Sequence, residues 1–350
     1  LQRDGWQVTL IDKVGPGESC SFGHAGVLSE TSALPNAMPG VMVKVPKWLL
    51  DPEGPLYIRF RYLPQLLPWL LRFLKAGTAS ESENTVRSLL ALNAGTVEKY
   101  QTLVNGSQVR SLIRPSGYLN VYQNESSFNH ASRGWELLRR HGAQLRMLSG
   151  EELHELEPTL SPSYIRAVLI ENQGYTTNPF RLAQVLSEQF SQTGGIILRR
   201  EVREVRLSAE GNVRLNLDLG YVESKKLLVA AGAWSHRFTA QLGVSIPLET
   251  ERGYHVTIAH PEVLPSHVIM EAERKFVATP MEIGLRFAGT AELAGLEAPP
   301  NYERAEILLR LGKRMFPGIS GTEKTEWMGH RPSLPDSRPV IGKCPDAPNI

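Results

Sequence analysis

The sequence predicts a mixed α/β (α+β) protein in which a Rossmann-like domain alternates along the chain with a strand-rich domain. With 350 residues, the chain exceeds the size of one ordinary hydrophobic core, which favours two domains. Strand patterns combined with helical ones occur near the beginning, in the middle and at the end of the chain. Strand-rich stretches lie between them, so we expect two interleaved domains and not two in tandem.

The composition is that of a globular protein, with 41% hydrophobic and 21% charged residues and no low-complexity tract. It excludes disorder, a collagen-like chain and a disulfide scaffold. The two cysteines, Cys20 and Cys344, cannot form a structural zinc site, and we expect no metal. A net charge of +2 gives no polyanion-binding footprint, so we expect no nucleic-acid partner. No apolar run reaches transmembrane length.

The first strand pattern, Trp6–Asp12, ends in an acid and follows a short helix-compatible start that Gly5 would end. In a dinucleotide-binding βαβ unit, the second strand ends in an acid that accepts hydrogen bonds from the adenosine ribose. The glycine-rich phosphate loop should lie about 20 residues upstream of that acid, which is before Leu1. We therefore expect Asp12 to belong to such a unit, with an ordinary turn residue as the alternative.

Two further segments have the small residues that a cofactor site requires. Gly15–Gly26 would let the backbone approach a cofactor closely and offer N–H groups to phosphate, although a plain surface loop is equally compatible with it. Leu227–Trp234 is an apolar strand pattern that runs into Gly232. A strand end made of small residues lies near the ligand in open α/β sheets.

Apolar periodicity and capping signals predict the helices. Leu66–Leu74 has basic flanks and is too short to span a bilayer, so it packs in the core or on the partner domain, or lies on a membrane surface. Glu81–Val104 reads as one long helix. The other expected helices are Arg133–Arg140, one that opens at Ser149, one from Asn178-Pro179 to Phe190, and Asn301–Met315.

Apolar and alternating runs predict the strands. The first group comprises Gly117–Tyr122, Ile196–Leu198, Val202–Leu207, Val213–Leu219 and Lys226–Ala231, with a hairpin turn at Ala209–Asn212. The second, strand-rich group comprises Glu251–Ile258, His267–Glu271, Lys275–Thr279 and Gly284–Gly289.

Several short segments carry a family likeness: Val8–Asp12, Ser21–Gly26, Thr177–Pro179, Ala231–Ser235, Glu251–His255, Gly284–Arg286 with Gly289–Glu292, and Gly329–Asp336. In order and spacing they resemble the FAD-dependent D-amino-acid oxidase family, which includes glycine oxidase, and most of all its bacterial D-amino acid dehydrogenases. The likeness covers nearly the whole chain. It implies an FAD-binding domain of residues 1–104, 166–237 and 323–350, and a substrate-binding domain of residues 105–165 and 238–322.

The same resemblance also has an implication for the two ends of the chain. Members of the family begin with a strand and a Gly-x-Gly-x-x-Gly loop, and they finish with a glycine-rich segment and a helix that close the flavin site. The sequence contains neither. The resemblance therefore implies a fragment whose FAD-binding domain is incomplete at both ends, and which binds FAD weakly or not at all.

The resemblance also implies the cofactor-binding residues. Asp12 would hold the adenosine ribose, and Val202 would meet the adenine through its backbone. The pyrophosphate and the flavin ring would be lined by Ser21, Gly23, His24, Ala25 and Gly26. The segment beside the pyrophosphate and ribose would be Ala231, Gly232 and Trp234. A covalent bond between His24 and the flavin is a minor alternative, because some relatives attach FAD through a histidine in a similar loop.

Three residues are expected to act on the substrate, namely Arg331, Arg286 and Tyr254. An α-amino acid would lose a hydride from Cα to the flavin N5, and its carboxylate needs a fixed cation such as a guanidinium fork. Arg331 matches the carboxylate-binding arginine of the family, and Arg286 is the second candidate. Tyr254 would donate a hydrogen bond to the same carboxylate or be an ordinary core tyrosine. No general base is needed if the amine arrives neutral.

The expected function is oxidation of the CH–NH₂ group of a D-amino acid to an imine and then a 2-oxo acid, with electrons passed to a respiratory acceptor. The alternatives are an oxygen-using amine oxidase of the glycine or sarcosine type, and a flavin-free binding or structural remnant. We expect a small amino-acid or amine substrate. The enzyme would be cytoplasmic, or peripheral on the inner membrane if its acceptor lies there. The sequence predicts no oligomeric state.

Overall fold

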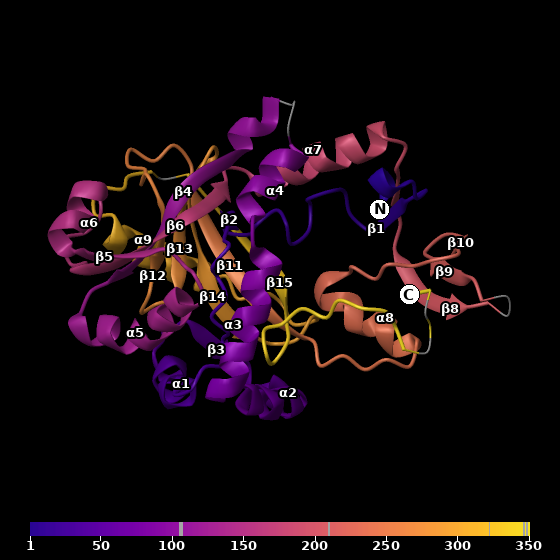
Figure 1. Ribbon diagram of the computed structural model, residues 1–350, viewed down its shortest axis with the longest axis horizontal. Helices are drawn as coiled ribbons and strands as arrows, with labels where there is room; N and C mark the ends of the chain where they lie inside the picture. Colours follow the sequence, from indigo (N-terminus) through magenta and orange to yellow (C-terminus); the bar gives the residue numbers. More distant parts are fainter. Residues whose placement is uncertain (105–107, 209–210, 322, 346, 348) are drawn as a thin grey trace.

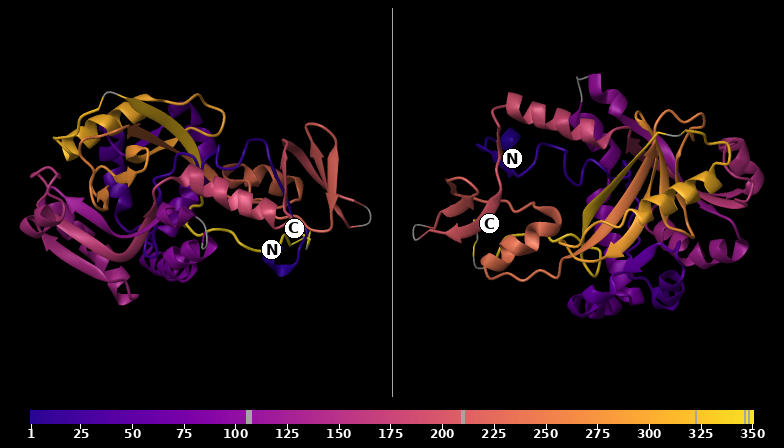
Figure 2. Two further views of the ribbon diagram at one scale, coloured as in Figure 1. Left: turned by 90° about the horizontal axis from the view of Figure 1, so that it is seen from above. Right: turned by 180° about the vertical axis from the view of Figure 1, so that it is seen from behind.

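The computed structural model describes residues 1–104, 108–208, 211–321, 323–345, 347 and 349–350. A large body, built on one curled sheet with helices around it, makes up most of the molecule (Figure 1). A smaller body lies to one side, and both ends of the chain lie beside it (Figures 1 and 2). This mixed α/β architecture confirms the predicted fold class.

The large sheet has the strand order β15-β11-β14-β13-β12-β4-β6-β2, with β3 also on β14 and β5 also on β6. Only β12–β4 and β14–β3 are parallel among these pairs. The strands are β2 (Val27–Leu28), β3 (Leu56–Ile58), β4 (Ile113–Tyr122), β5 (Leu145–Ser149), β6 (Arg166–Thr176), β11 (Glu249–Ile258), β12 (Val268–Glu271), β13 (Phe276–Met281), β14 (Gly284–Leu293) and β15 (Lys324–Ser333).

The two faces of this sheet differ in chemistry. On β11, Tyr254, Val256 and Ile258 belong to the main hydrophobic core, together with residues of α9 (Glu303–Met315) such as Leu308. Successive strand residues point to opposite faces, so Gly253, His255 and Thr257 lie on the other side. That side carries polar groups and the candidate site.

The smaller body contains the strand expected at the start of the chain. β1 (Thr9–Asp12) pairs in parallel with β7 (Ile196–Arg199), which follows α7 (Pro179–Gln192). Asn178 caps α7 as predicted, accepting a hydrogen bond from the Arg181 N–H at 3.0 Å. Beside this pair lie an antiparallel sheet of β8 (Val202–Leu207), β9 (Val213–Leu217) and β10 (Tyr221–Ser224), and helix α8 (Ser235–Gln241). A parallel strand pair with a helix leading into one of its strands is compatible with part of a Rossmann-like unit.

The predicted long helix over residues 81–104 is wrong in one respect. The structure has two helices there, α3 (Ala79–Asn93) and α4 (Thr96–Leu103). Gly95 has a φ of 69°, a left-handed conformation that interrupts a helix and that glycine adopts without steric cost.

The remaining helices extend or confirm the sequence predictions. α5 (Glu125–Arg140) contains the predicted 133–140, and Ser149 caps α6 (Gly150–Leu156) through a capping box with Glu152. The predicted apolar run over residues 66–74 lies within α2 (Leu63–Ala76), which sits with α1 (Val41–Leu50) at the lower edge of the molecule in Figure 1. Among the described residues, no helix combines the length and the apolar character needed to cross a membrane.

One predicted strand is wrong. Residues 226–231 form no strand, and the strand that follows β9 is β10, at residues 221–224. A strand requires a neighbour for its hydrogen bonds, whereas in the described part of the chain β1 and β7 pair only with each other. Leu227 instead donates its N–H to the carbonyl of Asn349 at 2.9 Å. In the predicted hairpin turn, Ala209 and Glu210 lie outside the described residues.

The division into two interleaved domains stays a prediction. β6 and β15 fall in the ranges expected to bind FAD, yet they pair with β4 and β11 of the other range within the one large sheet. Strand pairing therefore joins the ranges expected to bind FAD to the ranges expected to bind the substrate within one sheet.

Candidate active site

Arg331 lies on β15, with its guanidinium directed across β11 toward β14. Its Nη1 donates to the carbonyl oxygen of Thr290 at 2.8 Å and its Nη2 to that of Gly289 at 3.1 Å. Gly253 on β11 makes this path possible, because a Cβ there would lie 2.2 Å from Nη2 of Arg331. The glycine inside this strand is thus required by the close approach of a side chain.

β14 forms a bulge at the point where it receives Arg331. The register shifts so that Thr290 and Ala291 together face the single residue Gly253. Thr290 has a φ of 55°, which is rare for a β-branched residue. Its hydroxyl is buried and has no hydrogen-bond partner among the residues described. Backbone strain and an unpaired polar atom therefore coincide at the residue whose carbonyl holds Arg331.

The Arg331 guanidinium keeps donors for a ligand. Two of its five N–H groups make the bonds above, and in the described part of the chain no protein acceptor binds the other three. Burial lowers the pKa of Arg331, and the charge of Glu251 opposes that shift. Part of the side chain nevertheless stays open to solvent. Arginine remains charged under these conditions, so this fixed guanidinium keeps a positive charge and three donors for a ligand.

The loop from Ser21 to Gly26 is held to the large sheet by its carbonyl groups. Arg286 of β14 donates from Nη1 to the carbonyls of Phe22, at 3.2 Å, and His24, at 2.9 Å. Nδ1 of His255 on β11 lies 2.8 Å from the carbonyl oxygen of Gly23. Arg286 is 1% exposed, and within the described residues no carboxylate forms an ion pair with it. Its charge is therefore compensated mainly by the dipoles of this loop.

The same pattern continues to the end of the loop. The Ala25 carbonyl accepts from the Thr279 hydroxyl and the Gly26 carbonyl from the Thr176 N–H, each at 2.8 Å. In a trans peptide, a C=O group and the N–H that follows it point in opposite directions. The N–H groups of residues 23–25 are therefore turned away from the sheet, and none meets an acceptor in the described chain. A row of N–H groups of this kind suits an anionic or carbonyl-rich ligand.

Two neutral histidines support this loop. Burial, and then the charge of Arg286, lower the pKa of His255 to about 3 and that of His24 to about 4. Facing the carbonyl of Gly23, Nδ1 of His255 must carry the proton of the neutral ring. Nδ1 of His24 instead accepts the N–H of Gly26 at 2.8 Å. The two imidazoles thus adopt opposite tautomers, each set by the backbone.

Trp327 of β15 packs between this loop and its own strand. Its ring is stacked on His255 with a centroid distance of 5.3 Å. A Cβ at Gly23 would lie 2.0 Å from the indole, and one at Gly329 would lie 1.9 Å from it. Both glycines therefore make room for one aromatic ring.

Tyr254, expected at the substrate, points to the opposite face of the sheet. Its hydroxyl donates to the carboxylate of Glu292 and accepts the N–H of Asn301 at 2.9 Å. Burial and the hydrogen bond to Glu292 raise the pKa of Tyr254. Arg252 is fully buried nearby and forms an ion pair of 3.8 Å with Glu292. These contacts agree with the alternative that Tyr254 is an ordinary core tyrosine. A contact between Tyr254 and the substrate stays a prediction, as does one between Arg286 and the substrate.

The remaining predicted cofactor residues lie where the small body meets the large sheet. Asp12 ends β1 and accepts the N–H of Val14 at 3.1 Å. Trp234 packs edge-on against His330, the neighbour of Arg331, with 5.2 Å between ring centroids. The ammonium of Lys13 lies 5.1 Å from the Trp234 ring centre. Through Lys13 and Trp234, the end of β1 is thus linked to His330 of β15.

The other predicted members have fewer contacts. Val202 on β8 packs against the small cluster that includes Ile11. Ala231 and Gly232 precede Trp234, and Gly232 has a φ of 54°. Ser21 lies in the loop described above. Their contact with a cofactor stays a prediction.

A cavity of about 290 Å³ lies next to this junction. It is lined in part by Tyr62, Ala233, Glu249 and Thr250, and the Thr250 hydroxyl is 3.0 Å from Nδ1 of His330. Tyr62 donates to both oxygens of Glu249, at 2.9 and 3.1 Å. The polar groups of its wall are therefore largely paired with one another.

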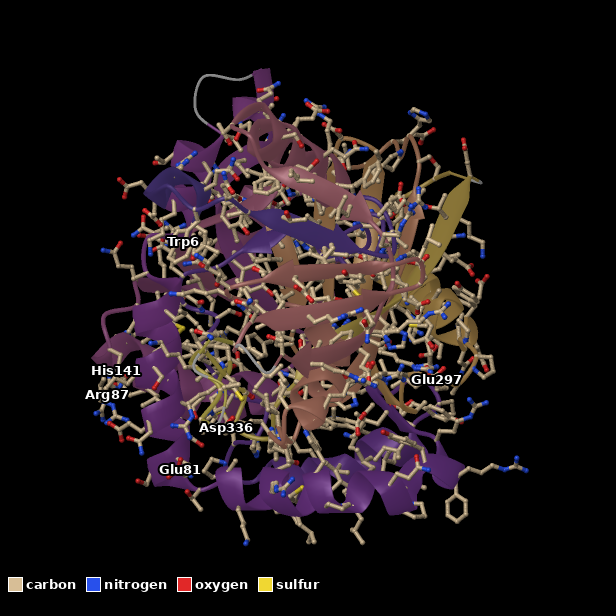
Figure 3. All side chains as sticks on the ribbon, turned by 90° about the vertical axis from the view of Figure 1, so that its right-hand side faces the viewer. Trp6, Glu81, Arg87, His141, Glu297 and Asp336 are labelled. Atoms are coloured by element: carbon tan, nitrogen blue, oxygen red, sulfur yellow. The ribbon has the colours of Figure 1, made fainter. Side chains whose placement is uncertain are left out.

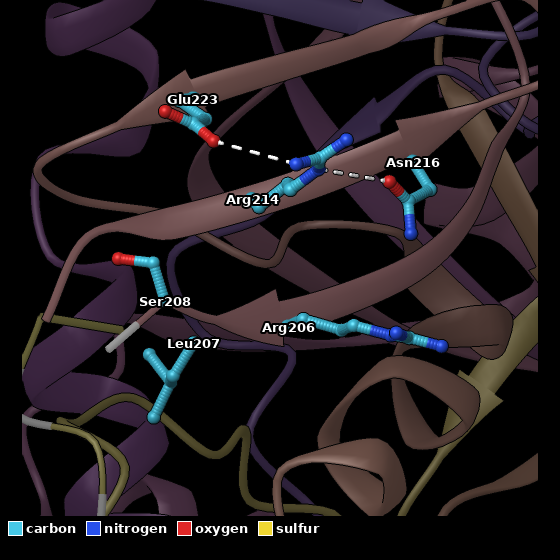
Figure 4. A pocket seen from close by; sticks show the side chains of 6 residues that line it. All are labelled: Arg206, Leu207, Ser208, Arg214, Asn216 and Glu223. Atoms are coloured by element: carbon cyan, nitrogen blue, oxygen red, sulfur yellow. Dashed lines mark hydrogen bonds and ion pairs between the residues drawn. The ribbon is translucent and has the colours of Figure 1, made fainter. Parts of the chain in front are cut away.

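A second cavity, of about 380 Å³, lies on the small sheet away from these residues (Figure 4). Arg206 and Arg214 line it, but they form ion pairs with Glu204 at 2.7 Å and Glu223 at 3.8 Å. We assign it no role. The described residues contain no group of three or more potential metal ligands.

Sequence reasoning missed Gly253, Thr290 and Trp327 as parts of the site. A partial signal was present, because Gly253 and Gly329 interrupt strand patterns, where glycine often marks a close approach. Nothing in the sequence indicated the bulge at Thr290.

The family model for FAD dependent oxidoreductases, DAO, matches residues 1–350. The chain belongs to this family. Its FAD cofactor follows from that membership, and the N–H groups of residues 23–25 are a fitting partner for a polar cofactor edge.

Curated relatives are similar to nearly the whole chain. The chain is 39% identical over 347 residues to a D-amino-acid oxidase of Bradyrhizobium diazoefficiens, covering 97% of this chain and 82% of the relative. It is 32% identical over 365 residues to a D-amino acid dehydrogenase of Paramagnetospirillum magneticum, covering 99% and 84%. Among solved structures, glycine oxidase from Geobacillus kaustophilus is similar with a TM-score of 0.72 and 19% identity, covering 99% of this chain and 82% of that one.

Proposed function

We propose that this DAO-family enzyme oxidises the CH–NH₂ group of a D-amino acid, using Arg331 to bind the substrate carboxylate. The observation that carries the proposal is the seat of Arg331: two backbone carbonyls fix its guanidinium, and three N–H groups remain for a ligand. A fixed guanidinium with free donors is the geometry that a carboxylate requires. The names of the relatives at 39% and 32% identity support an amino-acid substrate.

The other residues of the site would hold the cofactor. When bound, FAD supplies a hydride acceptor at the flavin N5. The N–H groups of residues 23–25 would bind its polar edge. Asp12, Val202 and the segment Ala231–Trp234 would contact its adenosine and pyrophosphate side. Arg286 would act through the loop carbonyls, since those are the groups it binds.

The stereochemistry of the substrate can be tested without any added acceptor. The FAD-bound protein is mixed anaerobically with matched D- and L-amino acids, and the loss of oxidised-flavin absorbance is followed together with 2-oxo acid formation. We expect D-amino acids to reduce the flavin and their L-forms to leave it oxidised. Reduction by the L-forms alone would reject the proposed substrate class.

For the electron acceptor we propose a respiratory carrier, with the enzyme cytoplasmic and peripheral on the inner membrane. The oxygen-using alternative has its own support, because the relative at 39% identity is named an oxidase. Turnover is measured in air with and without an artificial quinone, and peroxide is quantified. We expect quinone to accelerate turnover with little peroxide, whereas one peroxide per 2-oxo acid would establish the oxidase alternative.

A further inference from the structure

Helix α2 is apolar on two sides, and only one of them is covered by protein. Leu66 and Trp69 are buried in a small core with Leu293 of β14. Another stripe of α2 and the turn before it remains in solvent: Phe60, Leu63, Leu67, Leu71 and Leu74, which are 85%, 37%, 52%, 53% and 45% exposed. Their spacing of three or four residues places them on one face of the helix.

Helix α1 adds to this surface. Met42, Val43, Leu49 and Leu50 are exposed, and Val43 and Leu50 are each 83% exposed. Both helices lie at the lower edge of the molecule (Figure 1). Side chains along that edge project away from the protein (Figure 3). We call these nine residues of α1, α2 and the preceding turn the apolar edge. Exposed apolar side chains in this number on neighbouring helices at one edge are typical of an interaction site.

The charges around the apolar edge have one sign. Its exposed basic residues are Lys44, Lys47, Arg61, Arg72 and Lys75, and within the described chain none of them forms an ion pair with a carboxylate. The two acids between residues 41 and 77 are already engaged. Asp51 pairs with Arg274, and Glu53 pairs with Arg310 and Arg314. The edge therefore combines apolar side chains with uncompensated positive charge.

We propose that the apolar edge docks the protein on an anionic phospholipid surface. An exposed helix of about 21 Å at the edge of the molecule can meet a flat surface along its whole length. The apolar stripe would enter the boundary between headgroups and acyl chains, while lysine and arginine contact the lipid phosphates. A protein partner would instead have to supply both an apolar groove and several acids. The inference deepens the peripheral membrane location proposed above, because it names the surface that binds lipid. It concerns a surface separate from the active site and does not depend on the proposed reaction.

The test is sedimentation of the full chain with vesicles, without substrate. Vesicles of phosphatidylcholine alone are compared with vesicles that also contain phosphatidylglycerol, at low and high salt. We expect binding to the anionic vesicles, which weakens at high salt because screening shortens the range of the charges. Leu67→Glu with Leu71→Glu should lower the bound fraction at least about tenfold. Leu264→Glu, at a leucine that is 47% exposed elsewhere, is the matched control and should bind normally.

A second variant, Arg72→Glu with Lys75→Glu, alters only exposed side chains. It keeps the proposal testable if the leucine variant fails to fold. It should abolish the preference for anionic vesicles while the melting temperature stays unchanged. Failure of the wild type to sediment with anionic vesicles would overturn the proposal. So would equal binding of the wild type and the leucine variant. A wild-type dimer that the leucine variant converts to a monomer would overturn it in favour of contact between two copies.

Discussion

At the scale of residues, the site depends on side chains that bind backbone carbonyls. Arg286 binds those of Phe22 and His24, and Arg331 binds those of Gly289 and Thr290. Each guanidinium thereby fixes the backbone conformation of the segment that it binds and places a positive charge beside it. Removing either one leaves carbonyl groups unpaired, which costs more than the hydrogen bonds alone contribute.

Replacement of Arg286 by methionine should weaken FAD binding about tenfold or more. Without the guanidinium, two carbonyls of the loop lose a charged donor, and the N–H groups of residues 23–25 lose their common orientation. Titration of the apoprotein with FAD measures the effect. Arg304→Met is the matched control, because Arg304 is also buried but binds the carbonyls of Pro52 and Gly54. Equal losses in both variants would show general destabilisation only.

Replacement of Arg331 by alanine should raise KM for the amino acid about 100-fold, from the loss of roughly 3 kcal/mol of charged hydrogen bonding. The FAD content of the purified protein should not change. Steady-state kinetics and flavin absorbance separate the two effects. Unchanged KM would exclude Arg331 as the carboxylate-binding residue.

At the scale of elements, the arrangement of three neighbouring strands forms the seat of Arg331. β15 supplies the arginine, β11 a glycine that leaves room for it, and β14 a bulge that turns the carbonyl of Thr290 toward it. The strained φ of Thr290 costs on the order of 1–3 kcal/mol, which the surrounding sheet must offset.

Gly253→Ala should therefore act like a mild version of the Arg331 variant. The added Cβ would lie 2.2 Å from Nη2 and force the guanidinium away from the bulge. We expect KM to rise about tenfold, while FAD binding is retained, from displacement of one charged group. Gly342→Ala serves as the control, because a Cβ at Gly342 meets nothing within 4 Å. The seat as described would be wrong if Gly253→Ala left KM unaltered.

At the scale of the whole molecule, the site couples stability to pH. Burial lowers the pKa of His255 to about 3, below the ordinary value of 6.5. The folded state thus binds fewer protons than the unfolded one, so this stability is present above pH 6.5 and is lost as pH falls toward 3. His24 and His330, each lowered to about 4, contribute with the same sign. Glu271, raised to about 7 by burial, contributes with the opposite sign.

His255→Gln should reduce the loss of stability in acid. Relative to pH 8, the wild type should lose about 2 kcal/mol at pH 5 through His255 alone, and glutamine keeps an N–H donor without a titrating ring. Urea unfolding at pH 5, 6, 7 and 8 measures the difference between the two proteins, in which the effect of Glu271 cancels. Parallel pH profiles for the two proteins would show that His255 is not the cause.

Several local features of the fold were predictable from sequence because they depend on neighbouring residues. Asn178 and Ser149 cap the helices that follow them, and the second strand-rich group appears as β11 to β14. Local patterns do not specify features that depend on a residue far away in the sequence. Residues 226–231 have the apolar pattern of a strand but lack a neighbouring strand, and Tyr254 has a hydroxyl that Glu292 and Asn301 occupy.

By itself, the sequence determined the fold class, the family resemblance and the candidate arginine at Arg331, because these depend on composition, periodicity and the order of short segments. Only the tertiary structure decided which face of the sheet each residue serves. Gly253 and Tyr254 are neighbours in the chain, yet they lie on opposite faces. The bulge at Thr290, the bonds from Arg286 to the loop carbonyls and the exposed stripe of α2 all depend on contacts between distant segments, which local patterns do not specify.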